Sequence, residues 1–145
     1  VRNEMPNIIP MVMHFGKNAQ LSINVFVVNK PIKDVQLNIY LKEKNKSWYL
    51  FNEKKFDASF GNNGSILLTD LPSQTTDLFI CNTNKLVNGG TAVGRAAIRN
   101  FSLPLPATEM LTMSHPKYKQ FPSLYATNSD PCATAMEKEG ISVKK

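Results

Sequence analysis

Long apolar runs are absent from this sequence of 145 residues, although 42% of its residues are hydrophobic. A membrane-spanning helix needs about 20 consecutive apolar residues, so we predict no transmembrane segment in this chain. The sequence begins at Val1 rather than Met. A removed targeting or lipidation segment, with a membrane tether outside the chain, and a trimmed start are therefore both open alternatives.

Histidine and cysteine are rare, with two residues of each. A zinc site would need His14, His115, Cys81 and Cys132 together, and these four are scattered without ligand spacing. A serine hydrolase would use one histidine as its base. Ser114 precedes His115, but the chain has no Gly-x-Ser-x-Gly motif. We therefore predict no enzymatic activity, no metal and no other cofactor.

Arginine is also scarce, because 14 of the 17 basic residues are Lys. The net charge of +6 is compatible with a polyanionic partner, namely nucleic acid, acidic lipid or acidic glycan. Readout of bases and bidentate clamping of phosphates depend mainly on Arg. We therefore disfavour nucleic acid as a partner and interpret the lysines as a solvated surface.

The two cysteines leave two alternatives open. They are compatible with one disulfide formed in an oxidising compartment, or with two buried thiols. Cys81 ends the apolar run Leu78–Cys81, where a free thiol would pack as a small hydrophobic group. Cys132 lies at the start of a predicted helix. A Cys81–Cys132 bridge would tie the C-terminal segment to the rest of the domain.

Alternation of apolar and polar residues is the strongest pattern that the sequence does contain. Val35, Leu37, Ile39 and Leu41 alternate with polar residues, a period of two that is typical of a half-buried antiparallel strand. The segment 21–28 alternates in the same way. Because only a short link separates the two segments, we predict that they pair as a hairpin.

Turn residues divide the rest of the chain into further short elements. We interpret residues 1–20 as an edge segment or a strap along the sheet because they contain Pro6 and Pro10, and residues 82–90 as a polar loop. Residues 91–101 favour a helix-like turn followed by extended chain, with a strand over 96–103 as the alternative. Further strands are predicted at 48–51, 54–60, 66–68 and 78–81.

The C-terminal segment lacks the strand pattern of the rest of the chain and contains helix signals. Asp130 is a suitable N-cap, Pro131 suits the first helical position and Gly140 suits the stop, so we predict a short helix there. Regularly spaced short strands are typical of a β-sandwich. The fold class is therefore mostly β: one domain over 1–145, an antiparallel β-sandwich with a short C-terminal helix. Residues 104–145 form a Pro-rich C-terminal extension, and its short helix is predicted to pack on the sandwich.

A Pro-containing turn leads to a V-x-L strand at 35–37, and a later block, 64–72, has the spacing G-x-(apolar)-x-L-x-x-L-P. Through these motifs residues 21–81 resemble the transthyretin-like, carboxypeptidase-regulatory-like sandwich, whose pattern for the block is D-x-x-G-x-(apolar)-x-L-x-x-L-P. The predicted β-sandwich is therefore of transthyretin-like or immunoglobulin-like type. Gly61 stands where the family has Asp. The resemblance implies a seven-stranded sandwich with a non-catalytic binding, linking or secretion-apparatus role, as in exported envelope proteins that include a type VI secretion lipoprotein. The residues that fall on the block are Gly64, Ile66, Leu68, Leu71 and Pro72.

Two segments are candidate binding surfaces. Basic and aromatic residues interleave between Lys42 and Lys55, an arrangement that can stack on bases or sugars. Alternatively, the aromatic residues belong to the core and the lysines protect a sheet edge. The segment 120–126, with Phe121 and Tyr125, either packs on its own sandwich or binds another protein. The candidates in the first segment are Lys44, Lys46, Trp48, Tyr49, Lys54 and Lys55.

We therefore expect a non-catalytic module for protein–protein interaction or structure, with other proteins as its partners. It would belong to an exported or cell-envelope protein, including one of a secretion system, that is periplasmic, envelope-associated or secreted. One alternative is a binder of polyanions or glycans through residues 42–55. Another is a surface domain of a virion or an appendage.

Overall fold

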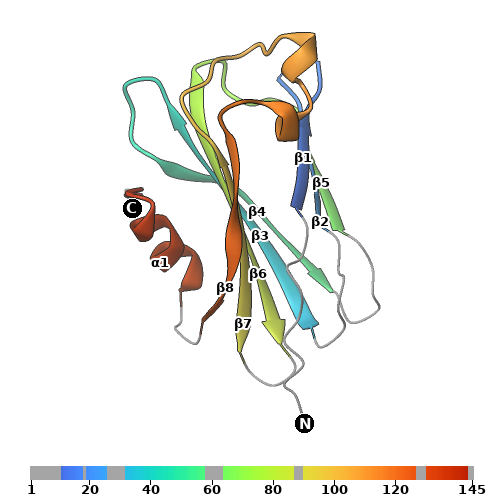
Figure 1. Cartoon of the computed structure of the whole chain (residues 1–145), viewed down its shortest axis with the longest axis vertical. Coiled ribbons are helices and arrows are strands. Elements are labelled where there is room, and N and C mark those ends of the chain that lie inside the picture. The colour runs from blue at the N-terminus through green and yellow to red at the C-terminus, as the bar shows by residue number, and fades with distance from the viewer. Residues whose placement is uncertain are drawn as a thin grey trace.

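The computed structural model describes residues 11–17, 19–25, 32–57, 64–86, 90–126 and 130–143. Within them the chain is mostly β, with strands in two antiparallel sheets and one short C-terminal helix, which confirms the predicted fold class (Figure 1). The strands are β1 (Met11–Phe15), β2 (Leu21–Val25), β3 (Ile32–Glu43), β4 (Tyr49–Asp57), β5 (Gly64–Leu68), β6 (Thr75–Leu86), β7 (Thr91–Ile98) and β8 (Tyr118–Ala126). The helical elements are two 3-10 turns, η1 (Ala107–Glu109) and η2 (Thr112–Ser114), and the α-helix α1 (Pro131–Lys138).

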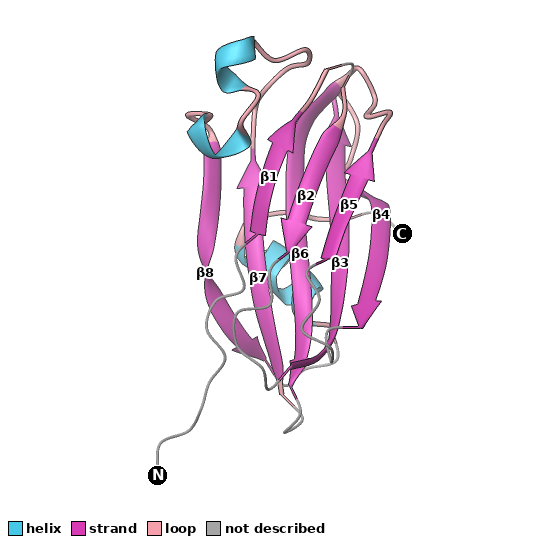
Figure 2. Cartoon of the chain, turned by 90° about the vertical axis from the view of Figure 1, so that its right-hand side faces the viewer, coloured by secondary structure: helices cyan, strands magenta, loops and turns pink. Residues whose placement is uncertain are grey.

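The two sheets differ in size. The smaller has the strand order β1-β2-β5 and the larger the order β4-β3-β6-β7-β8, with antiparallel neighbours throughout. Figure 2 shows the smaller sheet lying in front of the larger one. The predicted alternation in β3 is confirmed, because Val35, Leu37, Ile39 and Leu41 are buried in the interior between the sheets. Burial of one such side chain contributes about 1.5–3 kcal/mol.

The predicted hairpin between the segments 21–28 and 35–41 is wrong. β2 pairs with β1 and β5, whereas β3 pairs with β4 and β6, so the two strands lie in opposite sheets. Leu21, Ile23 and Val25 of β2 belong to the same buried cluster as the apolar residues of β3. Alternation shows that one face of each strand is buried, but not whether two strands pair edge to edge or pack face to face.

Several predicted boundaries are also corrected. Residues 49–57 form one strand, β4, rather than two, and β3 continues through Lys42 to Glu43. Of the segment 1–20, expected to be an edge segment or a strap, Met11–Phe15 forms β1, an edge strand that pairs with β2. Residues 1–10, 26–31, 58–63 and 87–89 lie outside the described part of the chain, as do the parts of the predicted turns that fall there.

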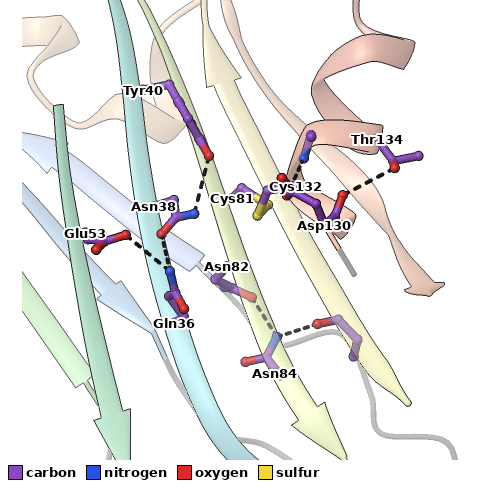
Figure 3. Close-up of a disulfide and its surroundings, with 12 residues drawn as sticks. Gln36, Asn38, Tyr40, Glu53, Cys81, Asn82, Asn84, Asp130, Cys132 and Thr134 are labelled. Carbon is purple, nitrogen blue, oxygen red and sulfur yellow. Dashed lines mark hydrogen bonds between the residues drawn. A yellow bond between two sulfur atoms is a disulfide. The ribbon is translucent and has the colours of Figure 1, made fainter. Parts of the chain in front are cut away.

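The predicted polar loop over 82–90 and helix-like turn after Thr91 are wrong, because β6 continues to Leu86 and β7 begins at Thr91. Asn82 and Asn84 are fully buried within β6, where Asn84 Nδ2 donates to Asn82 Oδ1 at 2.7 Å and to the carbonyl of Ala92 at 3.0 Å (Figure 3). Asn favours turns when it is exposed. Here the hydrogen bonds satisfy part of its buried amide and allow the strand to continue.

The C-terminal helix is confirmed. The Asp130 carboxylate accepts a hydrogen bond from the backbone N–H of Ala133 at 3.1 Å, Pro131 occupies the first turn, and Gly140 has a φ of +73° just after the helix. α1 lies against the outer face of the larger sheet (Figure 1). Within the described residues, no helix is both long and apolar enough to cross a membrane.

A second apolar core lies between α1 and the larger sheet. β6 and β7 contribute buried residues to their outer face as well as to the sandwich interior, which explains the unbroken apolar run at 78–81. The tail after α1 continues this layer, since Val143 forms a parallel bridge with Trp48. The buried members of this second core are Trp48, Phe79, Cys81, Val93, Ala97, Phe121, Cys132, Ala135, Met136 and Ile141.

Gly94 is required by its neighbour Asn82 on β6. A Cβ atom at Gly94 would lie 2.9 Å from Asn82 Oδ1 and 3.2 Å from Nδ2. We expect Gly94→Ala to lower the free energy of unfolding by about 1–3 kcal/mol in denaturant titrations, as overpacking does elsewhere. Asn82→Ala removes the clash, so the double variant should lose less stability than the sum of the single losses. Strictly additive losses would contradict this contact.

Candidate protein-binding surface

The outer face of β3 and β4, beside α1, is the candidate functional site. Antiparallel pairing places residues of the two strands directly opposite each other, and opposite residues share a face of the sheet. The outer row of β3 is Gln36, Asn38 and Tyr40, which are half-buried. We name this surface the β3 trough. Its three cross-strand pairs are Gln36 with Lys55, Asn38 with Glu53, and Tyr40 with Leu50.

Hydrogen bonds join the outer row of β3 into a ladder. Gln36 Nε2 donates to Asn38 Oδ1 at 2.9 Å and to Glu53 Oε2 at 3.4 Å, and Asn38 Nδ2 donates to the Tyr40 hydroxyl oxygen at 3.3 Å (Figure 3). The bonds from Gln36 to Asn38 and from Asn38 to Tyr40 run in one direction along β3, whereas the bond to Glu53 crosses to β4. Among the described residues none accepts the hydroxyl proton of Tyr40, so a ligand acceptor can use it.

A hollow lies at each end of this ladder. The polar hollow has a volume of about 390 Å³ and adjoins Gln36, whereas the apolar hollow has about 480 Å³ and adjoins Tyr40. Because residues two apart on a strand share a face, Asn38 lies between the two hollows on the same surface. The polar hollow is lined by Asp34, Gln36, Lys55, Thr83 and Lys85. The apolar hollow is lined by Tyr40, Leu50, Asp130, Ala133, Met136, Glu137, Ile141, Ser142 and Val143.

The two hollows carry opposite charge. The polar hollow has two lysines and one aspartate, while the apolar hollow has only the carboxylates of Asp130 and Glu137 at its rim. Burial raises the pKa of Tyr40 most; the hydrogen bond from Asn38 lowers it, and the charges of Asp130 and Glu53 raise it. The lining of the polar hollow is therefore net positive and that of the apolar hollow negative, with the Glu53 carboxylate on the ladder between them.

A disulfide fixes the α1 wall of the trough. Cys81 of β6 lies opposite Asn38 in the sheet and is bonded to Cys132 in the first turn of α1, with a Cα–Cα distance of 5.9 Å (Figure 3). Of the two alternatives for the cysteines, the structure has the bridge. It places the N-cap Asp130, together with Ala133 and Glu137 on one face of α1, along the trough.

Arg95 of β7 contacts the C-terminal end of α1 through Glu139. Its side chain is buried, its Nη2 donates to the carbonyl of Pro122 at 3.0 Å, and its Nη1 lies 3.9 Å from Glu139 Oε2. Burial lowers the pKa of Arg95, and the charge of Glu139 opposes that effect. The guanidinium lies 5.0 Å from the centre of the Phe121 ring, which adds a cation–π contact.

The predicted basic patch over 42–55 does not form one surface. Lys44 and Lys46 are exposed in the turn after β3, whereas Lys54 and Lys55 are exposed near the other end of β4. The six residue-to-residue steps along β4 from Tyr49 to Lys55 span about 20 Å. Lys55 is the only one of these four lysines that lines the trough.

The aromatic residues of that segment face the protein interior. Trp48 is 6% exposed in the second core, with the Arg99 guanidinium 5.5 Å from its ring centre. Tyr49 packs against the core between the sheets and donates its hydroxyl to Glu43 Oε2 at 2.8 Å. Burial, together with the Glu43 carboxylate, raises the pKa of Tyr49 to about 12. The Trp48 ring is therefore not available for stacking on a base or a sugar, and the Tyr49 ring is half-buried.

The second predicted segment, 120–126, is part of the edge strand β8. Phe121 is buried, with its ring centre 6.2 Å from that of Phe79 and 5.0 Å from the ammonium of Lys119. Tyr125 is 43% exposed. The strand therefore packs on its own sandwich through Phe121, and neither residue lines the trough.

Ser114 and His115 do not form a nucleophile–base pair. Ser114 Oγ donates to the carbonyl of Leu111 at 2.7 Å. His115 is buried, its Nδ1 accepts from the backbone N–H of Lys117 at 3.0 Å, and its Nε2 lies 4.0 Å from Glu109 Oε2. Within the part of the chain that the structure describes, no cluster of three or more His, Cys, Asp or Glu residues is suited to a metal ion.

Comparison with protein-family models, with curated proteins and with solved structures finds no match to this chain. The resemblance of residues 21–81 to transthyretin-like sandwiches therefore stays a prediction. Its spacing has a local explanation in the structure, since Ile66 and Leu68 of β5 and Leu71 after it are buried in the core between the sheets.

Sequence reasoning missed the trough, apart from Lys55. The signal was the polar half of the β3 alternation, which places Gln36, Asn38 and Tyr40 on one face. That pattern alone indicates a solvated face. The outer face became a site only because the distant helix α1 packs beside it, and no local pattern in β3 predicts that contact.

Proposed function

We propose that this chain is a non-catalytic protein-binding module of an exported or cell-envelope protein, and that its partner docks on the β3 trough. The observation that carries the proposal is the half-buried polar ladder between two hollows of opposite charge. The ladder lies on a hydrogen-bonded sheet beside a helix that a disulfide holds in place. Such a surface binds with little loss of conformational entropy, because it is already ordered.

The disulfide supports export. Such bonds persist in secreted proteins, in the periplasm and on cell surfaces, and are rare where thioredoxin and glutathione keep thiols reduced. The predicted resemblance to envelope sandwiches is compatible with the same compartment. A role in a secretion system and a tether outside this chain belong to the same proposal.

The distribution of charge favours a protein partner over a polyanion. A polyanion binder needs a continuous basic track with aromatic platforms. Here Lys44 and Lys46 are separated from Lys55 along β4, and Trp48 is buried. Carboxylates also line the apolar end of the trough, where they would repel a polyanion.

Two exposed leucines provide a matched test. Leu50 is 43% exposed in the trough, whereas Leu67 of β5 is 59% exposed on the other sheet. In pull-downs from the envelope fraction of the cells that make the protein, the wild type and Leu67→Asp should recover the same partner. Leu50→Asp should reduce that recovery at least about tenfold, because it buries a charge in the apolar hollow. Failure to recover a partner, or equal recovery with Leu50→Asp, would overturn the proposal.

A further inference from the structure

We infer that the occupant of the β3 trough is an extended peptide segment of the partner protein, a conclusion that rests on the proposed function. The segment carries an acidic side chain at the Lys55 and Lys85 end. About four residues away it carries a large apolar side chain that enters the hollow beside Leu50. The inference combines the spacing, the charge and the shape of the trough.

The spacing of the outer side chains of β3 matches that of side chains in an extended chain. Gln36, Asn38 and Tyr40 recur every second residue along β3, so their Cα atoms are about 6.6 Å apart. Side chains of an extended ligand recur on one face at the same interval. The distance from Gln36 to Tyr40 is then about 13 Å, which four residues of extended ligand cover. The side chains of a helical ligand repeat at 5.4 Å per turn, and this interval does not match the spacing of about 6.6 Å between alternate residues of β3.

The charges of the two hollows determine which end of the ligand carries acidic side chains and which end carries basic ones. Lys55 and Lys85 are both exposed, and with Asp34 they give the lining of the polar hollow a net charge of +1. The Glu53 carboxylate lies outside this lining, on the ladder, where it accepts from Gln36. The apolar hollow carries the two carboxylates of Asp130 and Glu137. An acidic side chain is therefore favoured at the first hollow and disfavoured at the second, where a basic residue at the rim is favoured instead.

The apolar hollow selects a peptide rather than a glycan. Its inner surface contains the buried side chains of Met136 and Ile141, together with the exposed part of Leu50. Aliphatic side chains fit such a pocket, whereas sugars require an exposed aromatic face and many polar partners. The hydroxyl proton of Tyr40 and the amide oxygen of Gln36 are suited to the backbone carbonyls and N–H groups of a peptide.

Two synthetic peptides of about seven residues test this inference. Each has two aspartates at one end, a leucine followed by a lysine at the other, and threonines between them, and the two peptides have opposite chain direction. Binding to the whole protein is measured by fluorescence anisotropy. We expect one direction to bind, and Lys55→Glu with Lys85→Glu to weaken it about tenfold through loss of two ion pairs. A peptide with lysines in place of the aspartates should prefer that double variant over the wild type.

The control is Lys44→Glu with Lys46→Glu, which changes the net charge equally but outside the trough. It should leave peptide affinity within about twofold of the wild type, because exposed charges far from a ligand are screened. If neither peptide binds, if the control variant weakens binding equally, or if heparin alone binds in a manner that depends on Lys55 and Lys85, the inference is overturned. A partner that still depends on Leu50 in pull-downs would then dock as a folded surface, and the proposed function would stand.

Discussion

Replacement of Cys81 and Cys132 by serine is expected to lower the free energy of unfolding by about 4 kcal/mol. The two residues are 51 positions apart in sequence, and the chain-entropy model gives about this value for a loop of that length. The bridge joins β6, a central strand, to the start of an α-helix of eight residues. A helix that short is not stable by itself in water, so the covalent link and the second core together hold α1 in place.

The measurement is a denaturant titration of the wild type and of the double serine variant, each with and without reductant. Reductant should destabilise the wild type by about the same amount as the mutations do, and it should leave the variant unchanged. If reductant has no effect on the stability of the wild type, or affects both proteins equally, the bridge does not stabilise this fold.

Phe79→Ala is expected to lower the free energy of unfolding by about 3–5 kcal/mol, as truncation of a buried aromatic side chain does elsewhere. Phe79 has no exposed surface and lies in the second core, on the α1 side of the larger sheet. Its ring centre is 6.2 Å from that of Phe121. The change would leave a cavity between the sheet and α1 while the sandwich interior stays intact.

Leu67→Ala is the control for this prediction, because Leu67 is 59% exposed on β5. It should change stability by no more than about 0.5 kcal/mol. Denaturation followed by circular dichroism gives both values. A loss below about 1 kcal/mol for Phe79→Ala would mean that the outer face of the larger sheet is not a core.

Sequence patterns correctly predicted the elements that depend on residues close together in the sequence. The alternation in β3 follows from the burial of Val35, Leu37 and Ile39 on one face. The helix α1 was predicted from Asp130 and Gly140, because capping involves only the first and last turns of a helix. These features need no knowledge of distant contacts.

The missed features all depend on contacts between segments that are far apart in sequence. β2 and β3 looked like a hairpin because a short link joins them, yet their apolar faces meet across the sandwich. Asn82 looked like a loop residue, yet Gly94 and Asn84 accommodate its amide inside the strand pair. Tertiary packing overrides local preference at such positions.

The candidate site likewise depends on contacts between distant segments that the sequence pattern does not show. Lys55 was selected as part of a basic segment, but its neighbours in space are Gln36 across the strand and Lys85 in the polar hollow. Trp48 and Tyr49 were selected for the same reason, but Trp48 is buried in the second core and Tyr49 packs half-buried against the core between the sheets. The trough combines residues from β3, β4, β6 and α1, and only the assembled sheet brings them together.

Chemical modification of lysines tests the assignment of the docking surface most directly. The exposed amines of Lys44, Lys46, Lys55 and Lys85 are methylated in the isolated protein and in the envelope fraction, and their reactivities are compared by mass spectrometry. Occupation of the β3 trough predicts that Lys55 and Lys85 become protected in the envelope fraction while Lys44 and Lys46 stay reactive. Protection of Lys44 and Lys46 alone, or equal reactivity of all four in both samples, would contradict the account.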